Sequence, residues 1–533
     1  MATPQDYLNL VAAIKAQPTN AAFHLQLQQM LAAQPELADT RADDPARYYH
    51  HNTVMPQWPA KFLHPKSEAE LIQMLEDNKN AFGSFRAMGD GYGFANAAAT
   101  GGCLVQMAGM NDLLPLEAEN FDQNLDFDED EYVRFEGGIT FGKLNDALAL
   151  TNRTVCQQPG YRSLTVAGCA SAGGHGSGIG LYGISGWIQA VELAYFDQNK
   201  NVKIARIEPA NGLTDPAKYA QAKDQNRYEL IKNDVLFHAA RCAQGHLGII
   251  TALTLKVRGR YTLKEDRWMS TWDEAWAQLP AMFANPSVHS VHVWINPYAT
   301  DAAAPKNPKV LITRLTKTDQ PPWGVRGIGI LFGGPNILTD VAGALLGNNP
   351  GPGIDSALAM CAKMDVRLKS TDALDFGPPN DLAVNAASLG FDASKGNDVM
   401  QQLLPQILAW KADGLLFTSP IGMRWVKASE DFLSPQYQRD TIMLEVPLLK
   451  PVVGNDTSKN VEALNRYANL MMNDWEGRPH WGQQNPMSAD QFKANYKNGI
   501  PSFVTAMKKF NSLKMFDGPL TAQLGLRALV DAS

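Results

Sequence analysis

The sequence predicts an α+β protein with two or more domains, and three observations support this fold class. A chain of 533 residues exceeds the length that one hydrophobic core usually serves. From Pro56 onward, segments with helical periodicity alternate with short apolar runs of strand composition. Two glycine-rich loops, residues 86–93 and 165–178, interrupt these elements and indicate a place where the backbone binds a ligand.

The bulk composition excludes several classes of function. Hydrophobic residues make up 45% of the chain and charged residues 19%, as in ordinary globular proteins, and the formal net charge of −7 comes without a basic stripe. We therefore expect no nucleic-acid partner. The N-terminus lacks a basic segment followed by an apolar one, and no apolar run reaches the roughly 18 residues of a membrane span. These features predict a cytoplasmic protein without a membrane partner.

The cysteines and the acidic residues give no sign of a metal site. The five cysteines show no CxxC pairing, so we predict buried thiols and neither a zinc site nor a disulfide framework. The acidic run at residues 126–131 lacks the spaced ligands of a calcium loop and is expected to be a solvated turn.

Residues 1–55 carry helical periodicity in two segments that Pro18 separates. We interpret these residues as a helical extension that packs against the main body. A contact between two copies of the chain in a homodimer is the alternative.

Residues 56–262 contain elements whose starts and ends follow from local signals. Ser67 and Glu70 form a capping box at the start of a helix over residues 67–77, and Thr140 caps a helix that continues through Leu148. Strands are expected at residues 103–107, 132–136 and 249–257, a hairpin at residues 187–196 and 202–207, and a further helix at residues 234–243.

The loop at residues 165–178, TVAGCASAGGHGSG, has the composition of neither a helix nor a strand, because seven of its fourteen residues are Gly or Ser. Glycines let backbone N–H groups approach a phosphate or a flat ring closely, and they reach positive φ freely. We interpret this loop and RAMGDGYG, residues 86–93, as two parts of one ligand cradle.

Together with GHLGIIT at residues 245–251, the two loops resemble, in order and spacing, the FAD-binding domain of the vanillyl-alcohol-oxidase, or para-cresol methylhydroxylase (PCMH) type, flavoprotein family. The loop at residues 165–178 is most similar to the alditol oxidase and aldonolactone oxidase branch. The resemblance covers residues 56–265 and returns at RPHWG, residues 478–482. It implies a two-part PCMH-type FAD-binding domain at residues 56–262, a mixed α/β substrate-binding cap at 263–470, and a segment at 471–533 that returns to the flavin site.

The resemblance also implies which residues contact FAD. Covalent relatives place a His in the first loop where this chain has Tyr92, so we predict that FAD is held non-covalently, with Cys156 or Cys169 as alternative points of attachment. A positioning role is expected for His175. The residues implied in FAD binding are Arg86, Gly89, Asp90, Gly91, Tyr92, Gly93, Thr165, Gly168, Ser171, Gly174, His175, Gly176, Gly248 and Ile250.

Three residues are candidates for catalysis through the same resemblance. Thr165 matches a serine that touches both flavin and substrate, Glu445 matches an acidic strand residue, and His480 is expected to act as an acid or base near its working pKa. Two cations of the alditol oxidases are missing, because Gln483 replaces a Lys and Pro447 replaces an Arg, although Glu-X-Pro resembles the aldonolactone oxidases. The loss puts polyol oxidation in doubt and favours a less polar substrate.

Two strands of the cap are expected to form the floor of a pocket above the flavin. In residues 291–295, His292 and Trp294 lie on the face opposite their apolar neighbours, and Glu445 does the same in residues 441–447. Loops of the cap are expected at the Pro- and Gly-rich residues 319–335 and 347–353.

The leading hypothesis is an FAD-dependent oxidoreductase that removes a hydride from a small hydroxylated or otherwise activated molecule and passes it to flavin N5. One alternative is a tailoring enzyme of secondary metabolism that oxidises or oxidatively decarboxylates a larger acid. Another is a non-catalytic FAD-binding protein. Molecular oxygen and other electron acceptors both stay open as the oxidant.

Overall fold

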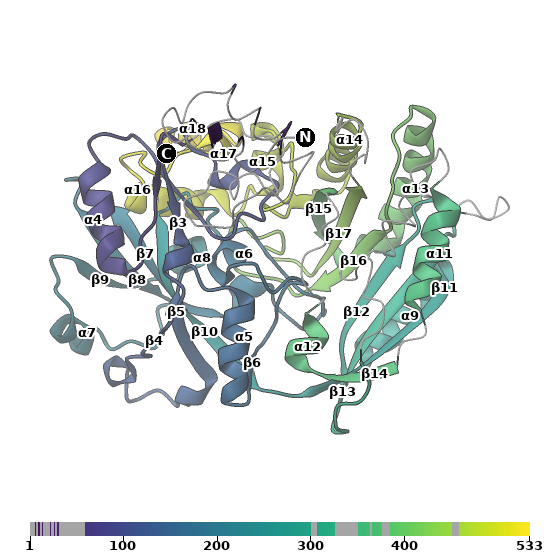
Figure 1. Ribbon diagram of the computed structural model, residues 1–533, viewed down its shortest axis with the longest axis horizontal. Coiled ribbons are helices and arrows are strands. Elements are labelled where there is room, and N and C mark those ends of the chain that lie inside the picture. Colours follow the sequence, from purple (N-terminus) through teal and green to yellow (C-terminus); the bar gives the residue numbers. More distant parts are fainter. Residues whose placement is uncertain are drawn as a thin grey trace.

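The protein, seen in a computed structural model, has two lobes that lie side by side (Figure 1). The structure describes residues 59–299, 306–325, 350–362, 365–375, 384–449 and 458–533, together with scattered helical positions between residues 6 and 30. The rest of the extension predicted for residues 1–55 lies outside the described residues. We call residues 59–259 the first lobe, and the sheet and helices that follow up to Pro479 the second lobe.

The first lobe begins with a small parallel sheet and one helix. The strands lie in the order β1-β3-β2 and span Lys61–Leu63 (β1), Cys103–Gln106 (β3) and Phe85–Met88 (β2). Helix α4 (Glu68–Asn78) starts where the sequence predicts, since the Ser67 side chain accepts a hydrogen bond from the Glu70 N–H at 3.2 Å. The Glu70 carboxylate accepts in return from the N–H of Lys66 at 2.9 Å, one residue before the cap.

A larger sheet completes the first lobe, and the predicted strands at residues 132–136, 187–196, 202–207 and 249–257 all belong to it. Helix α5 (Phe141–Leu150) starts at its predicted cap, Thr140, and α8 (Asp234–Arg241) covers most of the predicted helix. The strand order is β4 (Leu113–Leu114), β5 (Tyr132–Glu136), β10 (Ile249–Gly259), β7 (Ile188–Phe196), β8 (Val202–Glu208) and β9 (Tyr228–Lys232), with β6 (Arg153–Val155) also paired to β10.

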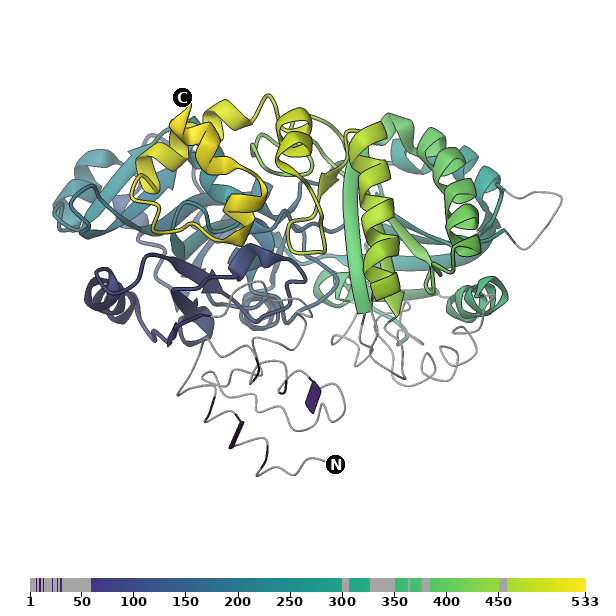
Figure 2. The ribbon, with the colours of Figure 1, turned by 90° about the horizontal axis from the view of Figure 1, so that it is seen from above.

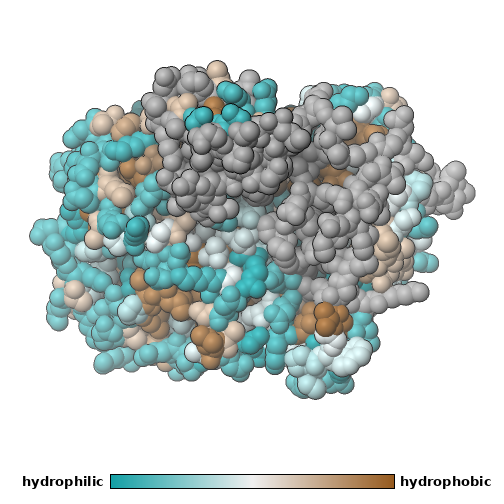
Figure 3. Space-filling model, viewed as in Figure 1, coloured by the Kyte–Doolittle hydropathy of each residue, from teal (hydrophilic) through white to brown (hydrophobic). Residues whose placement is uncertain are grey.

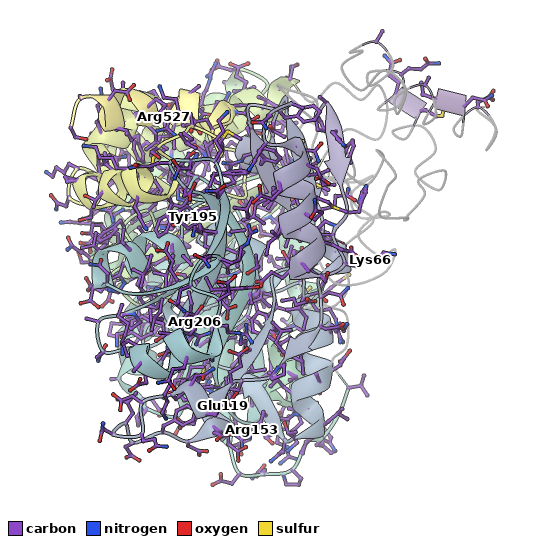
Figure 4. The ribbon with its side chains drawn as sticks, turned by 90° about the vertical axis from the view of Figure 1, so that its left-hand side faces the viewer. Lys66, Glu119, Arg153, Tyr195, Arg206 and Arg527 are labelled. Carbon is purple, nitrogen blue, oxygen red and sulfur yellow. The ribbon has the colours of Figure 1, made fainter. Side chains whose placement is uncertain are left out.

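Inside this sheet lies a buried ion network. The Glu192 carboxylate accepts from Arg134 Nε and Nη2 at 2.7 Å each and from Arg206 Nη1 at 2.9 Å. Arg206, which Figure 4 labels, also donates through Nε to Glu208 at 2.7 Å. Burial opposes ionisation of Glu192, but the two arginines outweigh it and hold the pKa of this carboxyl at about 2. The network joins β5, β7 and β8 and so reaches across β10, which lies between β5 and β7.

The second lobe is built on an eight-stranded antiparallel sheet. Its strands lie in the order β14 (Asp365–Lys369), β11 (Thr262–Thr271), β13 (Lys309–Thr318), β12 (Val288–Ile295), β16 (Ile421–Val426), β17 (Thr441–Leu449), β15 (Val384–Asp392) and β18 (Arg478–Pro479). The helices α9 (Trp272–Ala284), α11 (Gly351–Cys361), α13 (Gly396–Ala412) and α14 (Ser458–Asp474) pack around it (Figure 2). Because the strands of the two large sheets divide between Gly259 and Thr262, we propose the domain boundary there.

The predicted apolar faces of the second lobe are buried, but one predicted loop is not a loop. Val293 and Leu444 are fully buried in the core, and Trp294 on the opposite face of β12 is buried as well, so burial does not distinguish the two faces of this strand. Residues 319–325 have no regular structure beyond a bridge between Trp323 and Arg367. The loop predicted at residues 347–353 is wrong for its described part, because α11 starts at Gly351. Proline is tolerated in the first helical turn, where its missing N–H has no partner in the helix.

The C-terminal segment, residues 480–533, crosses back from the second lobe to the first, where its yellow helices lie in Figure 2. It contains α15 (Ala489–Asn495), α16 (Ile500–Phe510), α17 (Pro519–Gln523) and α18 (Leu526–Asp531). Helix α16 packs against α8. An ion pair between Lys509 Nζ and Glu229 Oε1 at 3.2 Å fastens α16 to the large sheet of the first lobe.

No helix of the described ranges has both the length and the apolar character needed to span a membrane. On the face shown in Figure 3, the coloured residues are mostly hydrophilic, and hydrophobic side chains gather in small separate patches. Such patches are normal on globular proteins.

Candidate active site

The central glycine-rich stretch, residues 165–178, combines a short helix with a loop. Thr165 has extended backbone angles at the N-cap of α6 (Val166–Ser171), so the prediction that this stretch has no helix is wrong. Val166 and Ala170 are fully buried, and this tertiary packing supports a turn that composition alone would not. After the helix the chain turns at Gly173, whose φ of +74° favours glycine.

The first glycine loop lies directly against this helix. A Cβ atom on Gly89 would overlap the Thr165 hydroxyl, so only a glycine allows the two loops to approach so closely. Gly91 has a φ of +78°, which also favours glycine. The N–H of Phe94 donates to the carbonyl of Gly482 at 2.7 Å and joins the loop to the HWG element. The two predicted halves of the cradle therefore meet.

The HWG element, residues 480–482, is held between the central helix and the second lobe. The Trp481 N–H donates to Ala172 O at 2.9 Å, and its buried indole donates to Leu433 O at 2.6 Å. The N–H of His480 donates to the carbonyl of Ser388 on β15 at 2.9 Å. This return of the chain to the loops was expected from the sequence.

Several of the predicted FAD-binding glycines are required by their protein neighbours. A Cβ on Gly174 would overlap Cys169, and one on Gly176 would overlap Gln157. Gly248 has a φ of +156° and faces the carbonyl of Ala194. Their small size therefore shapes the loops. Of the other predicted residues, Asp90, Tyr92, Gly93, Ser171 and Ile250 are half-buried.

Arg86 is buried and binds backbone carbonyls from distant parts of the chain. Its Nη1 donates to Gly245 O at 3.0 Å and to Phe516 O at 2.8 Å, and its Nε donates to Ala97 O at 2.9 Å. Its Nη2 donates to Ala97 O and Gln244 O. All of the guanidinium N–H groups thus have protein partners, so we assign Arg86 to positioning the loops. A contact between this side chain and FAD stays a prediction.

Two histidines face each other where the loops meet. The ring centroids of His175 and His480 lie 5.8 Å apart in an edge-on arrangement. Burial, together with His480 and Arg424, lowers the pKa of His175 to about 3. Burial lowers the pKa of His480 to about 4, although Glu445 opposes it. Both shifts favour neutral rings at pH 7, and the role of His480 as an acid or base stays a prediction.

Hydrogen bonds assign the ring protons of the two neutral histidines. The backbone N–H of Gly482 donates to His480 Nδ1 at 3.1 Å, so this ring carries its proton on Nε2. His175 Nδ1 lies 2.9 Å from the carbonyl of Gly176, which can only accept, so this ring carries its proton on Nδ1. His480 is thus a hydrogen-bond donor through Nε2 and has no lone pair left for a base.

Glu445 is the carboxylate of the site, and it holds two polar neighbours. Its Oε1 accepts from Gln483 Nε2 at 2.8 Å, and its Oε2 lies 3.5 Å from Arg424 Nη2. Arg424 is on β16, where Gly422 is the residue paired with Glu445. Arg424 thus places one cation beside Glu445 from the neighbouring strand. Sequence reasoning missed Arg424, because its only signal is strand alternation in residues 421–426.

Tyr161 is a second residue of the site that the sequence reasoning missed. Burial and the nearby Glu445 raise the pKa of its hydroxyl, and Arg424 works against them. Tyr92 raises this pKa further. The first loop, Tyr161 and the cap strands therefore share one electrostatic environment. In Figure 1, β15, β16 and β17 lie on the side of the second lobe that faces the first lobe.

Two protein-family models match the chain. A model for the FAD binding domain matches residues 59–198, and a model for D-arabinono-1,4-lactone oxidase matches residues 253–523, just over half of the chain. The chain belongs to the D-arabinono-1,4-lactone oxidase family. It is an FAD-dependent oxidoreductase that resembles aldonolactone oxidases and dehydrogenases, as the resemblance in the sequence predicts.

The relatives of the chain are distant in sequence, but the similarity extends along most of its length. The L-gulono-1,4-lactone dehydrogenase of Mycobacterium tuberculosis is 21% identical over 82% of this chain and 90% of its own length. The L-gulonolactone oxidase of Bos taurus is 21% identical over 86% and 93%. A cholesterol oxidase variant from Brevibacterium sterolicum has a TM-score of 0.64 at 14% identity and covers 88% of this chain and 94% of its own. It bears out the predicted α+β fold, with a PCMH-type FAD-binding domain and a cap.

The residues at the junction of the loops fit the FAD that this family uses. Gly168 is exposed although Ala167 and Cys169 beside it are buried, and a Cβ on Gly168 would press against the Thr165 hydroxyl. The start of α6 and the first loop thus offer bare backbone at one place, which is what close approach to a phosphate or flavin ring requires. Residues 89–93 and 165–176 are the parts of the chain that would hold the cofactor.

Proposed function

We propose that this chain oxidises a CH–OH group of a small hydroxylated substrate such as an aldonolactone, with Glu445 as the proton acceptor and His480 as a hydrogen-bond donor. When bound, FAD supplies the hydride acceptor at flavin N5. The observation that carries the proposal is the opposite chemistry of the two side chains. The carboxylate of Glu445 offers lone pairs, whereas His480 offers the N–H of Nε2.

The neighbours of these two residues support the roles. Gln483 orients one carboxylate oxygen of Glu445, and Arg424 lies 3.5 Å from the other. His175 packs edge-on against His480 and holds it in place, and Thr165 lies beside the first loop with its hydroxyl facing Gly89. This assignment moves the base from His480, where the sequence suggested it, to Glu445.

The test is anaerobic reduction of the bound flavin in variants of the two residues. Glu445→Gln keeps the shape and removes the acceptor, so we expect flavin reduction to slow by about 10²–10⁴-fold with unchanged FAD content. His480→Gln keeps a donor and is the matched control, with a smaller loss. Reduction at the wild-type rate in Glu445→Gln would exclude this residue as the base.

We further propose that FAD is held non-covalently. Tyr92 stands where covalent relatives have a His, and burial raises the pKa of Cys156 to about 11 and of Cys169 to about 12, so neither thiol is a ready nucleophile. All five cysteines are buried, and none of them forms a disulfide bond. Acid precipitation should therefore release the yellow colour into the supernatant. A yellow pellet, with the mass of FAD added to the denatured chain, would contradict the proposal.

The other proposals about function are more general. Two relatives are named lactone enzymes, which supports a lactone over the larger acid of a tailoring enzyme. No flavin reduction by any hydroxylated compound would favour the alternative of a non-catalytic FAD-binding protein. We keep molecular oxygen as an electron acceptor, the homodimer and the cytoplasmic location as proposals. Plant relatives carry the word mitochondrial in their names, so cell fractionation is the direct test of location.

A further inference from the structure

A cluster of two cations lies where the chain passes from the first lobe to the second. Arg258 is near the end of β10 in the first lobe, and Lys317 lies on β13 of the second lobe. The Arg258 guanidinium lies 4.5 Å from the ring centroid of Tyr261, and Lys317 Nζ lies 5.9 Å from the same centroid. Both cations therefore gather around one aromatic ring at the junction of the lobes.

The polar side chains that the two cations contact are neutral. The Tyr261 hydroxyl accepts from Arg258 Nη2 at 2.5 Å and lies 2.9 Å from His289 Nε2. Burial raises the pKa of Tyr261 to about 12, so the phenol keeps its proton. Burial, together with Arg258 and Lys317, lowers the pKa of His289 to about 3, so this ring is neutral and accepts the hydrogen bond of the phenol. Neither group supplies a negative charge.

No carboxylate of the described ranges forms an ion pair with Arg258 or Lys317. The carbonyl of Cys156 accepts from Arg258 Nη2 at 3.2 Å, and burial raises the pKa of the Cys156 thiol to about 11. Glu131, a carboxylate that also acts on this thiol, is held by Lys256 Nζ at 2.9 Å. The protein therefore brings two positive charges together without a counter-charge among the described residues.

This arrangement favours an anion from solution. Two like charges near one another destabilise the fold, and the pKa of Lys317 shows the effect, because burial and the charge of Arg258 both lower it. Ions can reach the cluster, since Lys317 is exposed and a Cβ on the exposed Gly259 would meet no atom within 4 Å. An anion with several oxygens can accept from a guanidinium and an ammonium at the same time.

We propose that Arg258 and Lys317 form a binding site for a phosphate-class oxyanion that bridges the two lobes. A tetrahedral oxyanion matches the planar fork of a guanidinium and the point charge of an ammonium. Because Arg258 belongs to the first lobe and Lys317 to the second, the bound anion ties the two large sheets together beside the crossing of the chain at residues 259–262. The free ion and a phosphate ester are the two sources of such a group.

The experiment titrates inorganic phosphate into the full-length, FAD-loaded protein, with sodium chloride adjusted to hold the ionic strength constant. Calorimetry gives the Kd, and thermal unfolding over the same series gives the Tm. Lys317→Ala removes one cation from an exposed position, and Arg258→Lys keeps the charge but loses the guanidinium fork. Lys264→Ala is the matched control, because it removes the same charge from the neighbouring strand β11, where Asp266 at 3.0 Å already balances the lysine.

We expect saturable phosphate binding to the wild type, with a Tm that rises along the same curve. Lys317→Ala should weaken binding by roughly tenfold and lose most of the rise in Tm, because one of the two charges that face the anion is gone. Arg258→Lys should weaken binding to a smaller degree. Lys264→Ala should bind phosphate as the wild type does.

Several outcomes would overturn the site. The absence of saturable binding to the wild type is one, and an equal change of Kd in Lys317→Ala and Lys264→Ala is another, since overall charge alone would then explain the binding. A rise in Tm of the same size in the wild type and Lys317→Ala would show a general salt effect and overturn the bridge.

A parallel titration with glycerol 3-phosphate distinguishes the two sources of the oxyanion. Tighter binding of this ester than of the free ion, lost in Lys317→Ala, would support the site with a phosphate ester as its ligand. Equal or weaker binding of the ester would support the site with the free ion. None of these measurements depends on flavin reduction, so they separate the anion site from the proposed oxidation.

Discussion

The carboxylates of Glu192 in the first lobe and Glu445 in the second lobe are both largely buried beside arginines, yet their surroundings differ. Glu192 receives three short bonds from two arginines, two of them as a bidentate pair at 2.7 Å. Glu445 receives one amide bond and has its arginine at 3.5 Å. A carboxylate with all its positions filled holds strands together, whereas one with unfilled neighbours is available to a ligand.

The largest effect expected from this difference is on stability. Arg134→Met leaves Glu192 buried with a lost bidentate partner and should lower the free energy of unfolding by about 3–5 kcal/mol. Arg424→Met should lower it by no more than about 2 kcal/mol, because its contact is longer and partly exposed. Urea titrations of both variants measure the two values. Equal losses would show that the Glu445 group is structural.

When flavin reduction is measured, Arg424→Met should show the larger effect of the two variants. Arg424→Met loses the guanidinium beside Glu445 and should reduce the flavin roughly tenfold more slowly, a change of about 1.4 kcal/mol. Arg134→Met, assayed at a low temperature where it is folded, should keep the wild-type rate. A slow Arg134→Met enzyme would mean that the ion network of the first lobe also acts on the site.

A smaller effect concerns the dependence of stability on pH. The pKa of Glu192 is about 2 in the folded chain, below its ordinary value of 4.5, so this carboxyl stabilises the fold above pH 4.5. The contribution is lost as the pH falls from 4.5 towards 2. Denaturant titrations across this range should show a smaller fall in the free energy of unfolding for Arg134→Met than for the wild type, because the strongest partner of Glu192 is absent. A fall of the same size in the variant and the wild type would argue against the pairing of Arg134 with Glu192.

The smallest expected effect is a missing feature in the pH profile of the reaction. Both site histidines have folded pKa values below their ordinary 6.5, so neither should titrate between pH 5.5 and 8. Flavin reduction should show no break near pH 6.5 that His175→Gln or His480→Gln removes. The free energy of unfolding, in contrast, should decline below pH 6.5. In the unfolded chain these histidines bind protons at that pH, whereas in the folded chain their buried rings stay neutral. If the wild type shows a break near pH 6.5 and His480→Gln does not, His480 is the base.

The comparison also explains how much of the protein follows from its sequence. The helix starts at Ser67 and Thr140 and the hairpin around residues 197–201 depend on neighbours within a few residues, and local patterns found them. Arg424 could not be found in this way, because its role depends on the pairing of β16 with β17. The tautomer of His480 depends on one N–H of Gly482 and on burial, which composition does not reveal.

The hydrogen bond from Arg86 to Phe516 has a consequence for the order in which the protein matures. The two residues are separated by 430 positions. The guanidinium that positions the first glycine loop therefore forms this hydrogen bond only when the C-terminal segment is in place. Contacts of such long range form late and slow the search for the native topology. During synthesis the N-terminal part leaves the ribosome long before its last partner exists. The first glycine loop therefore takes its final arrangement only after the C-terminal segment has folded against the first lobe.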